Sequence, residues 1–206
     1  MSRALYSILE WITRFAYINI LWVFFSLVGG ILLGLFPATI AMFSLIRQWL
    51  KGNSDLPVFK SFWQYYKSEF FKSNRLGVIV YMVSLIFIFN IFFLQANIGE
   101  LLTWTYAPLL AGFLLFIILL FYIFPTYVHF DLKVSQIFKN AFLMMLVSPM
   151  HTFLIFISLG AFYFIVSAIP ALGLAFGASF YCFITMWFAL DAFNKIDKKK
   201  APDTTT

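Results

Sequence analysis

Residues 15–46 read FAYINILWVFFSLVGGILLGLFPATIAMFSLI, a charge-free run of 32 residues that lies between Arg14 and Arg47. A single helix of this length would be about 48 Å long, at about 1.5 Å per residue. The hydrocarbon core of a bilayer is only about 30 Å thick. A single spanning helix would therefore leave apolar residues outside the hydrocarbon core, whereas two spanning helices would each be shorter than the core requires. The topology of the chain depends on whether and where this run turns.

The rest of the chain is also strongly apolar. Of the 206 residues, 63% are hydrophobic and 11% are charged, against roughly 45–50% and 25% in soluble domains. Three further charge-free runs follow, and each reaches the ~20 residues of a spanning helix: Leu76–Gly99, Leu101–Phe130 and Asn140–Leu190. We expect an all-α polytopic helical bundle in the lipid bilayer, with a single domain over residues 1–200 and a disordered tail over residues 201–206.

The composition argues against several other classes of protein. The first apolar run far exceeds the ~7–15 residues of a signal-peptide core, so we expect it to be retained. The single cysteine, Cys182, excludes an intramolecular disulfide and a cysteine-based metal site, and we expect a buried apolar thiol. The net charge of +6 would suit nucleic acid, but the basic residues are confined to the connections between apolar runs, as membrane orientation requires. We expect no nucleic-acid partner.

The positive charges favour six spans over five. If residues 15–46 form a hairpin that turns near Gly34–Pro37, all fourteen Lys and Arg residues lie on the cytoplasmic side, together with both termini. If the run crosses once, the chain has five spans, and Arg3 and Arg14 lie outside. Both arrangements obey the positive-inside tendency, but only the first obeys it without exception. We expect a multi-pass plasma-membrane protein with a cytoplasmic C-terminus and six spans, and five spans stay open.

A second helical pattern runs from Val58 to Lys72, with aromatic residues on one face and lysines on the other. This pattern predicts a cytoplasmic amphipathic helix that lies along the anionic membrane surface. Its aromatic face either only anchors the connection or docks a partner protein. The candidate docking residues are Phe59, Phe62, Trp63, Tyr66 and Phe70.

The run Asn140–Leu190 is long enough for two spans. The small residues and the proline of Ser167–Gly173 predict the turn between them. Pro149 lies inside the earlier span, where we expect it to kink the helix.

Polar residues within the spans are few. The expected spans contain no Asp, Glu, Lys or Arg, which argues against an ion-coupled carrier with a carboxylate relay. The candidate polar intramembrane residues are Asn19, Asn90 and His151. For the two asparagines we favour hydrogen bonds that hold helices together. For His151 we favour helix capping or an interhelical hydrogen bond.

No catalytic or cofactor motif is present. His129 and Asp131 are two residues apart, a spacing that matches no metal motif. The sequence has no phosphate-binding glycine loop, nucleophile elbow or zinc-protease helix. We therefore expect no enzyme activity, no cofactor and no catalytic or metal-binding residue.

Several segments of the first seventy-odd residues form a distinctive pattern. They are Tyr17-Ile-Asn-Ile-Leu-Trp22, Gly29-Gly30, Gly34-Leu-Phe-Pro37-Ala-Thr39, Ile46-Arg47-Gln-Trp49 and Phe59-Lys-Ser-Phe62-Trp. In these segments the sequence resembles the YesL family of bacterial membrane proteins. The later spans match only in hydropathy and length. The resemblance implies a Gram-positive plasma-membrane protein of unknown function, commonly encoded beside systems for carbohydrate import and plant-polysaccharide utilisation. It supplies no catalytic residue.

Two functions are consistent with these features. We favour a non-enzymatic accessory or assembly component associated with carbohydrate ABC import, with ABC importer subunits as partners. The alternative is a stand-alone facilitator or transporter of a small neutral or sugar-like solute, which a continuous polar cavity among Asn19, Asn90 and His151 would support. The oligomeric state is not predicted.

Overall fold

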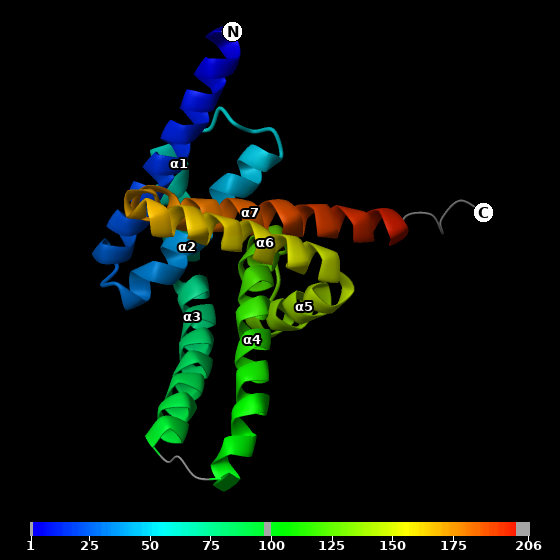
Figure 1. Ribbon diagram of the computed structural model, residues 1–206. Helices are drawn as coiled ribbons and strands as arrows, with labels where there is room; N and C mark the ends of the chain where they lie inside the picture. Colours follow the sequence, from blue (N-terminus) through cyan, green and yellow to red (C-terminus); the bar gives the residue numbers. More distant parts are fainter. Residues whose placement is uncertain (1, 97–99, 201–206) are drawn as a thin grey trace, which may run out of the picture.

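The computed structural model describes residues 2–96 and 100–200 (Figure 1). These residues form seven helices and no strand, which confirms the all-α prediction. Apart from α5, each helix is long and apolar enough to cross a membrane. The protein is therefore a multi-pass membrane helical bundle. The tail 201–206, which was expected to be disordered, lies outside the described residues. The helices are α1 (Ser2–Val28), α2 (Leu32–Leu50), α3 (Val58–Ala96), α4 (Glu100–His129), α5 (Val134–Val147), α6 (Pro149–Ala168) and α7 (Pro170–Lys200).

Helices α1 and α2 form the hairpin that the positive charges favoured, but the turn was predicted in the wrong place. It lies between Val28 and Leu32, where Gly30 and Ile31 have φ angles of 75° and 63°. Gly34 serves packing instead, because a Cβ atom there would lie 2.3 Å from the carbonyl oxygen of Ser26. Pro37 lies inside α2. The glycine that suggested a turn is thus the one that lets two helices approach closely.

The amphipathic segment and the next span form one continuous helix. The segment Val58–Lys72 is helical, as predicted, but it is the first part of the 39-residue helix α3 and not a separate element along the membrane surface. At about 1.5 Å per residue, α3 is about 58 Å long, well beyond the thickness of a hydrocarbon core. Residues 70–76 contain no glycine or proline, and the helix continues through the polar run Lys72-Ser-Asn-Arg75.

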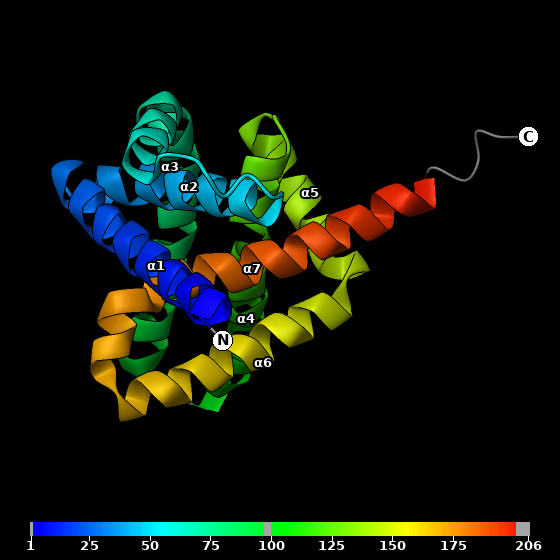
Figure 2. The ribbon, with the colours of Figure 1, turned by 90° about the horizontal axis from the view of Figure 1, so that it is seen from above.

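Helix α2 is the centre of the molecule. In its apolar spanning segment, 61% of the residues are buried inside the protein. The corresponding share is at most 28% in any other candidate span of the described residues. It contacts α1, α3, α4 and α7. Helices α3 and α4 lie side by side and extend away from this centre, while α6 and α7 run alongside each other and cross α4 steeply (Figures 1 and 2). The walls of any site near α2 therefore come from several helices.

Two prolines begin helices in the last third of the chain. Pro170 follows Ala168 closely and is the first residue of α7, which confirms the turn predicted within Ser167–Gly173. Pro149 was expected to kink a span, and this was wrong, because Ser148 separates α5 from α6 and Pro149 begins the new helix. Proline is favoured at the first helical position, where its missing N–H costs no hydrogen bond.

Candidate functional site

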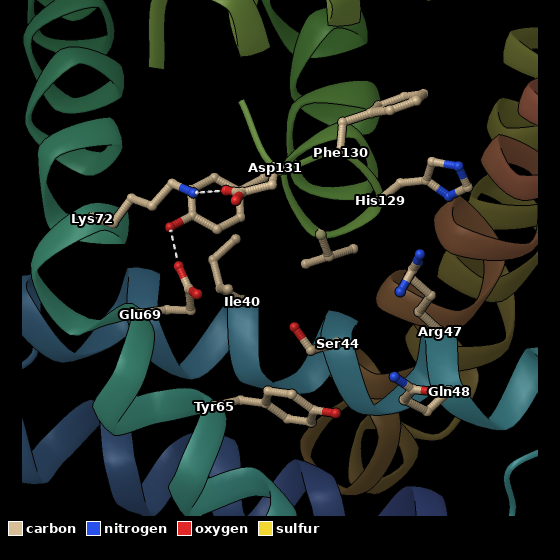
Figure 3. Close-up of a pocket in the computed structure, with 12 residues that line it drawn as sticks. Ile40, Ser44, Arg47, Gln48, Tyr65, Glu69, Lys72, His129, Phe130 and Asp131 are labelled. Atoms are coloured by element: carbon tan, nitrogen blue, oxygen red, sulfur yellow. Dashed lines mark hydrogen bonds and ion pairs between the residues drawn. The ribbon is translucent and has the colours of Figure 1, made fainter. Parts of the chain in front are cut away.

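A polar cavity of about 330 Å³ lies where α2, α3 and the end of α4 meet. Figure 3 shows Ser44 and Arg47 directed from α2 toward the space that Glu69 and Lys72 enter from α3. The lining residues are Ile40, Ser44, Arg47, Gln48, Tyr65, Glu69, Lys72, Tyr127, Val128, His129, Phe130 and Asp131. These residues come from three separated parts of the sequence, so the cavity exists only in the folded chain.

Two polar pairs join α3 to the end of α4 at this cavity. The buried Tyr127 hydroxyl donates a hydrogen bond to Glu69 Oε2 over 2.6 Å. Lys72 Nζ lies 2.7 Å from Asp131 Oδ1, and the Lys72 ammonium also lies over the Tyr127 ring, 5.4 Å from its centroid. The hydrogen bond and the positive charge of Lys72 lower the pKa of Asp131 below its ordinary value. Both carboxylates of the cavity thus already have a partner within the chain.

Arg47 is different from these four residues. It lies in the last turn of α2, where a positive charge complements the helix dipole. Its Nε atom is buried and has no hydrogen-bond partner among the residues that the structure describes. In the described part of the molecule, no carboxylate forms an ion pair with Arg47. The cavity therefore contains a guanidinium whose hydrogen-bonding capacity is not fully used.

The candidate docking residues on α3 divide into an inner and an outer group. Phe62 and Tyr66 are buried, and both pack against Phe25 of α1, with the Tyr66 hydroxyl donating to the Phe25 carbonyl oxygen over 3.2 Å. Phe70 is half-buried against the core. Phe59 and Trp63 remain 52% and 44% exposed. Only these two present a large surface to a partner.

Asn19 joins α1 to α7. It is only 3% exposed, and its Nδ2 donates to the Leu174 carbonyl oxygen over 2.7 Å. Its Oδ1 accepts from the backbone N–H groups of Ala178 and Ser179 over 3.2 and 3.3 Å. Leu174 and Ala178 are four residues apart and would bond directly in a regular helix. Figure 2 shows that α7 bends sharply in its first, orange part, and the Asn19 side chain binds the backbone groups at that bend.

The other two polar candidates lie apart from Asn19. Asn90 was expected to hold helices together, and this was wrong, because it is exposed on α3 and donates to the carbonyl oxygen of Ile86 in its own helix. His151 Nε2 lies 3.0 Å from Asp191 Oδ2, which Lys195 also contacts at 2.7 Å. The predicted interhelical hydrogen bond of His151 is therefore present, between α6 and α7. In the described residues the three side chains share no hydrogen-bond partner, so the polar cavity that would support the facilitator hypothesis gains no support from them.

The structure also locates the remaining candidates. His129 lies between aromatic rings, 4.5 Å from the Phe130 centroid and 4.7 Å from the Phe193 centroid. Among the described residues, no three His, Cys, Asp or Glu side chains gather as metal ligands would. Cys182 is buried, as predicted.

The cavity at Arg47 was not predicted from the sequence, because each of its charged residues looks there like an ordinary charged residue near the end of a helix. Lys72 ends the amphipathic segment Val58–Lys72, Asp131 was considered only for its spacing from His129, and Glu69 was given no role. Tyr127 was counted as part of a span. No periodicity links α2, α3 and α4, so their convergence leaves no local signal.

The chain is similar to three curated proteins of Bacillus subtilis (strain 168). It is 36% identical to "Uncharacterized protein YesV" over 198 residues, which cover 96% of this chain and 95% of that protein. It is 36% identical to "Uncharacterized protein YteU" over 183 residues, covering 88% and 82%, and to "Uncharacterized protein YesL" over 159 residues, covering 75% and 72%. The family described as "Protein of unknown function, DUF624" matches residues 15–91. No solved structure matches the chain.

Proposed function

The chain belongs to the YesL-like family of membrane proteins of unknown function, and from this premise we propose that it is a non-enzymatic accessory or assembly component associated with carbohydrate ABC import. The carbohydrate association follows from the context that the family resemblance implies. The contact with importer subunits is assigned to the exposed edge of α3 that Phe59 and Trp63 form.

One observation carries this proposal: α3 presents two aromatic side chains from a rigid base. The buried Phe62 and Tyr66 fix the helix on Phe25, so the positions of their exposed neighbours are fixed as well. Trp63 itself stacks on Tyr66 and Phe25, with ring centroids 5.9 and 5.3 Å apart. Aromatic residues held in a defined geometry are typical centres of protein interfaces.

Exposed basic side chains surround this edge. Lys60 and Lys67 are exposed on the same part of α3, together with Gln64. A polar and charged rim around an aromatic centre is the usual composition of a non-obligate interface. The same side chains would also suit the boundary between lipid and water, so the experiment must separate a protein partner from lipid.

The experiment is photo-crosslinking in native membranes from a cross-linking amino acid placed at residue 63. A second protein carries the same group at Phe62, which is 0% exposed, and a third carries it at Phe71, which is 87% exposed. We expect adducts with ABC importer subunits from residue 63, fewer from residue 71 and none from residue 62. Adducts with lipid alone from residue 63, under conditions where importer subunits are expressed, contradict the proposal.

The proposed orientation places both termini and the basic connections in the cytoplasm. A cysteine at Ser2 tests it, because the native Cys182 is buried and should not react with a membrane-impermeant thiol reagent. We expect labelling only after the cells are opened. Labelling in intact cells would place the N-terminus outside and contradict this orientation.

A second candidate function is facilitated passage of a small neutral or sugar-like solute. The bend of α7 at Asn19 favours it, because backbone groups of a spanning helix bind a side chain there, and substrate sites of secondary transporters often form where spanning helices depart from regular geometry. Uptake of a panel of radiolabelled sugars into proteoliposomes tests this function. Uptake no faster than into protein-free liposomes contradicts it.

A further inference from the structure

The carboxylates near Arg47 are already engaged by other residues. Glu69 accepts the hydrogen bond of Tyr127, and Asp131 pairs with Lys72. Arg47 takes part in none of the ion pairs among the described residues. Its permanent positive charge is therefore available to an anion that enters the cavity.

The Nε atom of Arg47 makes the case stronger. A buried donor without a partner destabilises the fold, and the cost is larger when the group is charged. Nε is such a donor, and the side chain that carries it lines the cavity. Because Nε has almost no exposed surface, an oxyanion accepts from it only when the Arg47 side chain shifts toward the cavity, and the planar guanidinium then suits the two-point binding of oxyanions.

The other donors of the cavity favour phosphate over a carboxylate. The hydroxyl groups of Ser44 and Tyr65 line the same space as Arg47. Lys72 is a second cation, and its partner Asp131 has a side chain that is 96% exposed. An ammonium has three N–H donors, so Lys72 can keep its bond to Asp131 and still donate to a ligand. With the carboxylates of Glu69 and Asp131 bound by Tyr127 and Lys72, two cations and two hydroxyl donors face the several acceptor oxygens of a phosphate group.

The size and the place of the cavity agree with such a ligand. About 330 Å³ is near the lower end of the roughly 300–1,000 Å³ of small-molecule sites. The cavity lies at the C-terminal ends of α2 and α4, which are also the ends of two candidate spans. Because these helix ends carry partial negative charge, the attraction for an anion must come from Arg47 and Lys72. A lipid headgroup and a soluble phosphate ester can both reach such a place.

From these observations we propose that the cavity between α2, α3 and α4 binds a phosphate group through Arg47, with Lys72, Ser44 and Tyr65 as further donors. The phosphate belongs either to an anionic lipid headgroup or to a small phosphate ester. This site is separate from the exposed edge at Phe59 and Trp63, so it does not depend on the proposed function.

The test uses the full-length protein in dodecyl maltoside, a detergent without phosphate. The thermal unfolding midpoint is measured in two titrations, because a ligand of the folded state raises that midpoint. One titration adds glycerol phosphate, with sodium chloride of equal ionic strength as its reference. The other adds phosphatidylglycerol in mixed micelles. A saturable rise in the first assigns a soluble ester, and a rise confined to the second assigns a lipid.

Variants connect the response to Arg47. We expect Arg47→Gln to weaken the apparent affinity at least about tenfold, because a hydrogen bond from a charged donor is lost. Lys60→Gln removes one positive charge outside the cavity and should keep the wild-type response. Tyr65→Phe keeps every charge and should weaken binding about threefold, the loss of one neutral hydrogen bond, so the test remains informative even where Arg47→Gln fails to fold.

Three results would overturn the proposal. They are no saturable rise in either titration, the same affinity in Arg47→Gln as in Lys60→Gln, or an equal rise when acetate replaces the phosphate ester at matched ionic strength.

Discussion

Asn19 and Arg47 are both polar residues at contacts of α1 or α2 with other helices, yet the chain uses them in opposite ways. Both amide atoms of Asn19 bind backbone groups of α7. Arg47 lines a cavity, and its buried Nε has no hydrogen-bond partner in the described part of the chain. A polar group whose bonds are completed within the chain stabilises the fold. A polar group with unused capacity beside a cavity is available to a ligand.

The largest effect is expected from Asn19→Leu. The substitution leaves the Leu174 carbonyl and the Ala178 and Ser179 N–H groups without the side chain that binds them at the bend. We expect a loss of about 2–4 kcal/mol in the free energy of unfolding, since buried polar groups without partners are costly. Thermal unfolding in detergent, followed by circular dichroism, measures it.

Asn90→Leu is the matched control for that variant. Asn90 is exposed and bonds only to its own helix, so its replacement should change stability by no more than about 0.5 kcal/mol. Equal losses in the two variants would show that Asn19 has no special role at the bend.

An intermediate effect is expected from Tyr127→Phe. The hydroxyl of Tyr127 is the donor to Glu69 at the cavity, and its removal leaves the carboxylate with one hydrogen bond fewer. We expect a loss of about 1–2 kcal/mol in the free energy of unfolding. Tyr163→Phe removes a hydroxyl from an exposed ring and should have no measurable effect. If the two variants behave alike, the bond to Glu69 contributes nothing.

The smallest effect is expected from Asp131→Asn, and it should depend on pH. Lys72 lowers the pKa of Asp131 in the folded protein below its ordinary value of 3.8. The stabilisation by this pair is therefore present above pH 3.8 and is lost as the pH falls through the lowered pKa. The difference in melting midpoint between wild type and the variant should be small at pH 7, should decrease with added salt, and should vanish in acid. A difference in melting midpoint that grows as the pH falls would contradict this prediction.

The sequence predicted the number of spans better than their geometry. Charge counting and hydropathy depend on composition along the chain, so the hairpin of α1 and α2 and the six spans could be predicted. The turn was placed near Gly34 because a glycine permits a turn and a close helix contact equally well, and the sequence does not distinguish the two. The aromatic pattern of residues 58–72 likewise predicted an apolar face, but not that Phe25 covers Phe62 and Tyr66.

The candidate site was harder to predict than the spans. Asn19 was correctly assigned to a contact between helices, because an amide in an apolar span needs a partner. Arg47, Lys72 and Asp131 were each considered only within their own part of the sequence, and Glu69 was given no role. Their convergence depends on the way α3 and α4 pack beside α2, which is a property of the tertiary fold.

The central claim is that Asn19 serves the fold and Arg47 serves a ligand. The most direct measurement is the thermal unfolding midpoint of Arg47→Leu beside that of Asn19→Leu, in the same phosphate-free detergent. The account predicts that Arg47→Leu melts within about 2 °C of wild type or above it, since a buried donor without a partner is removed. Asn19→Leu should melt at least about 4 °C lower than wild type. A loss in Arg47→Leu as large as that in Asn19→Leu would make Arg47 a structural residue and contradict the account.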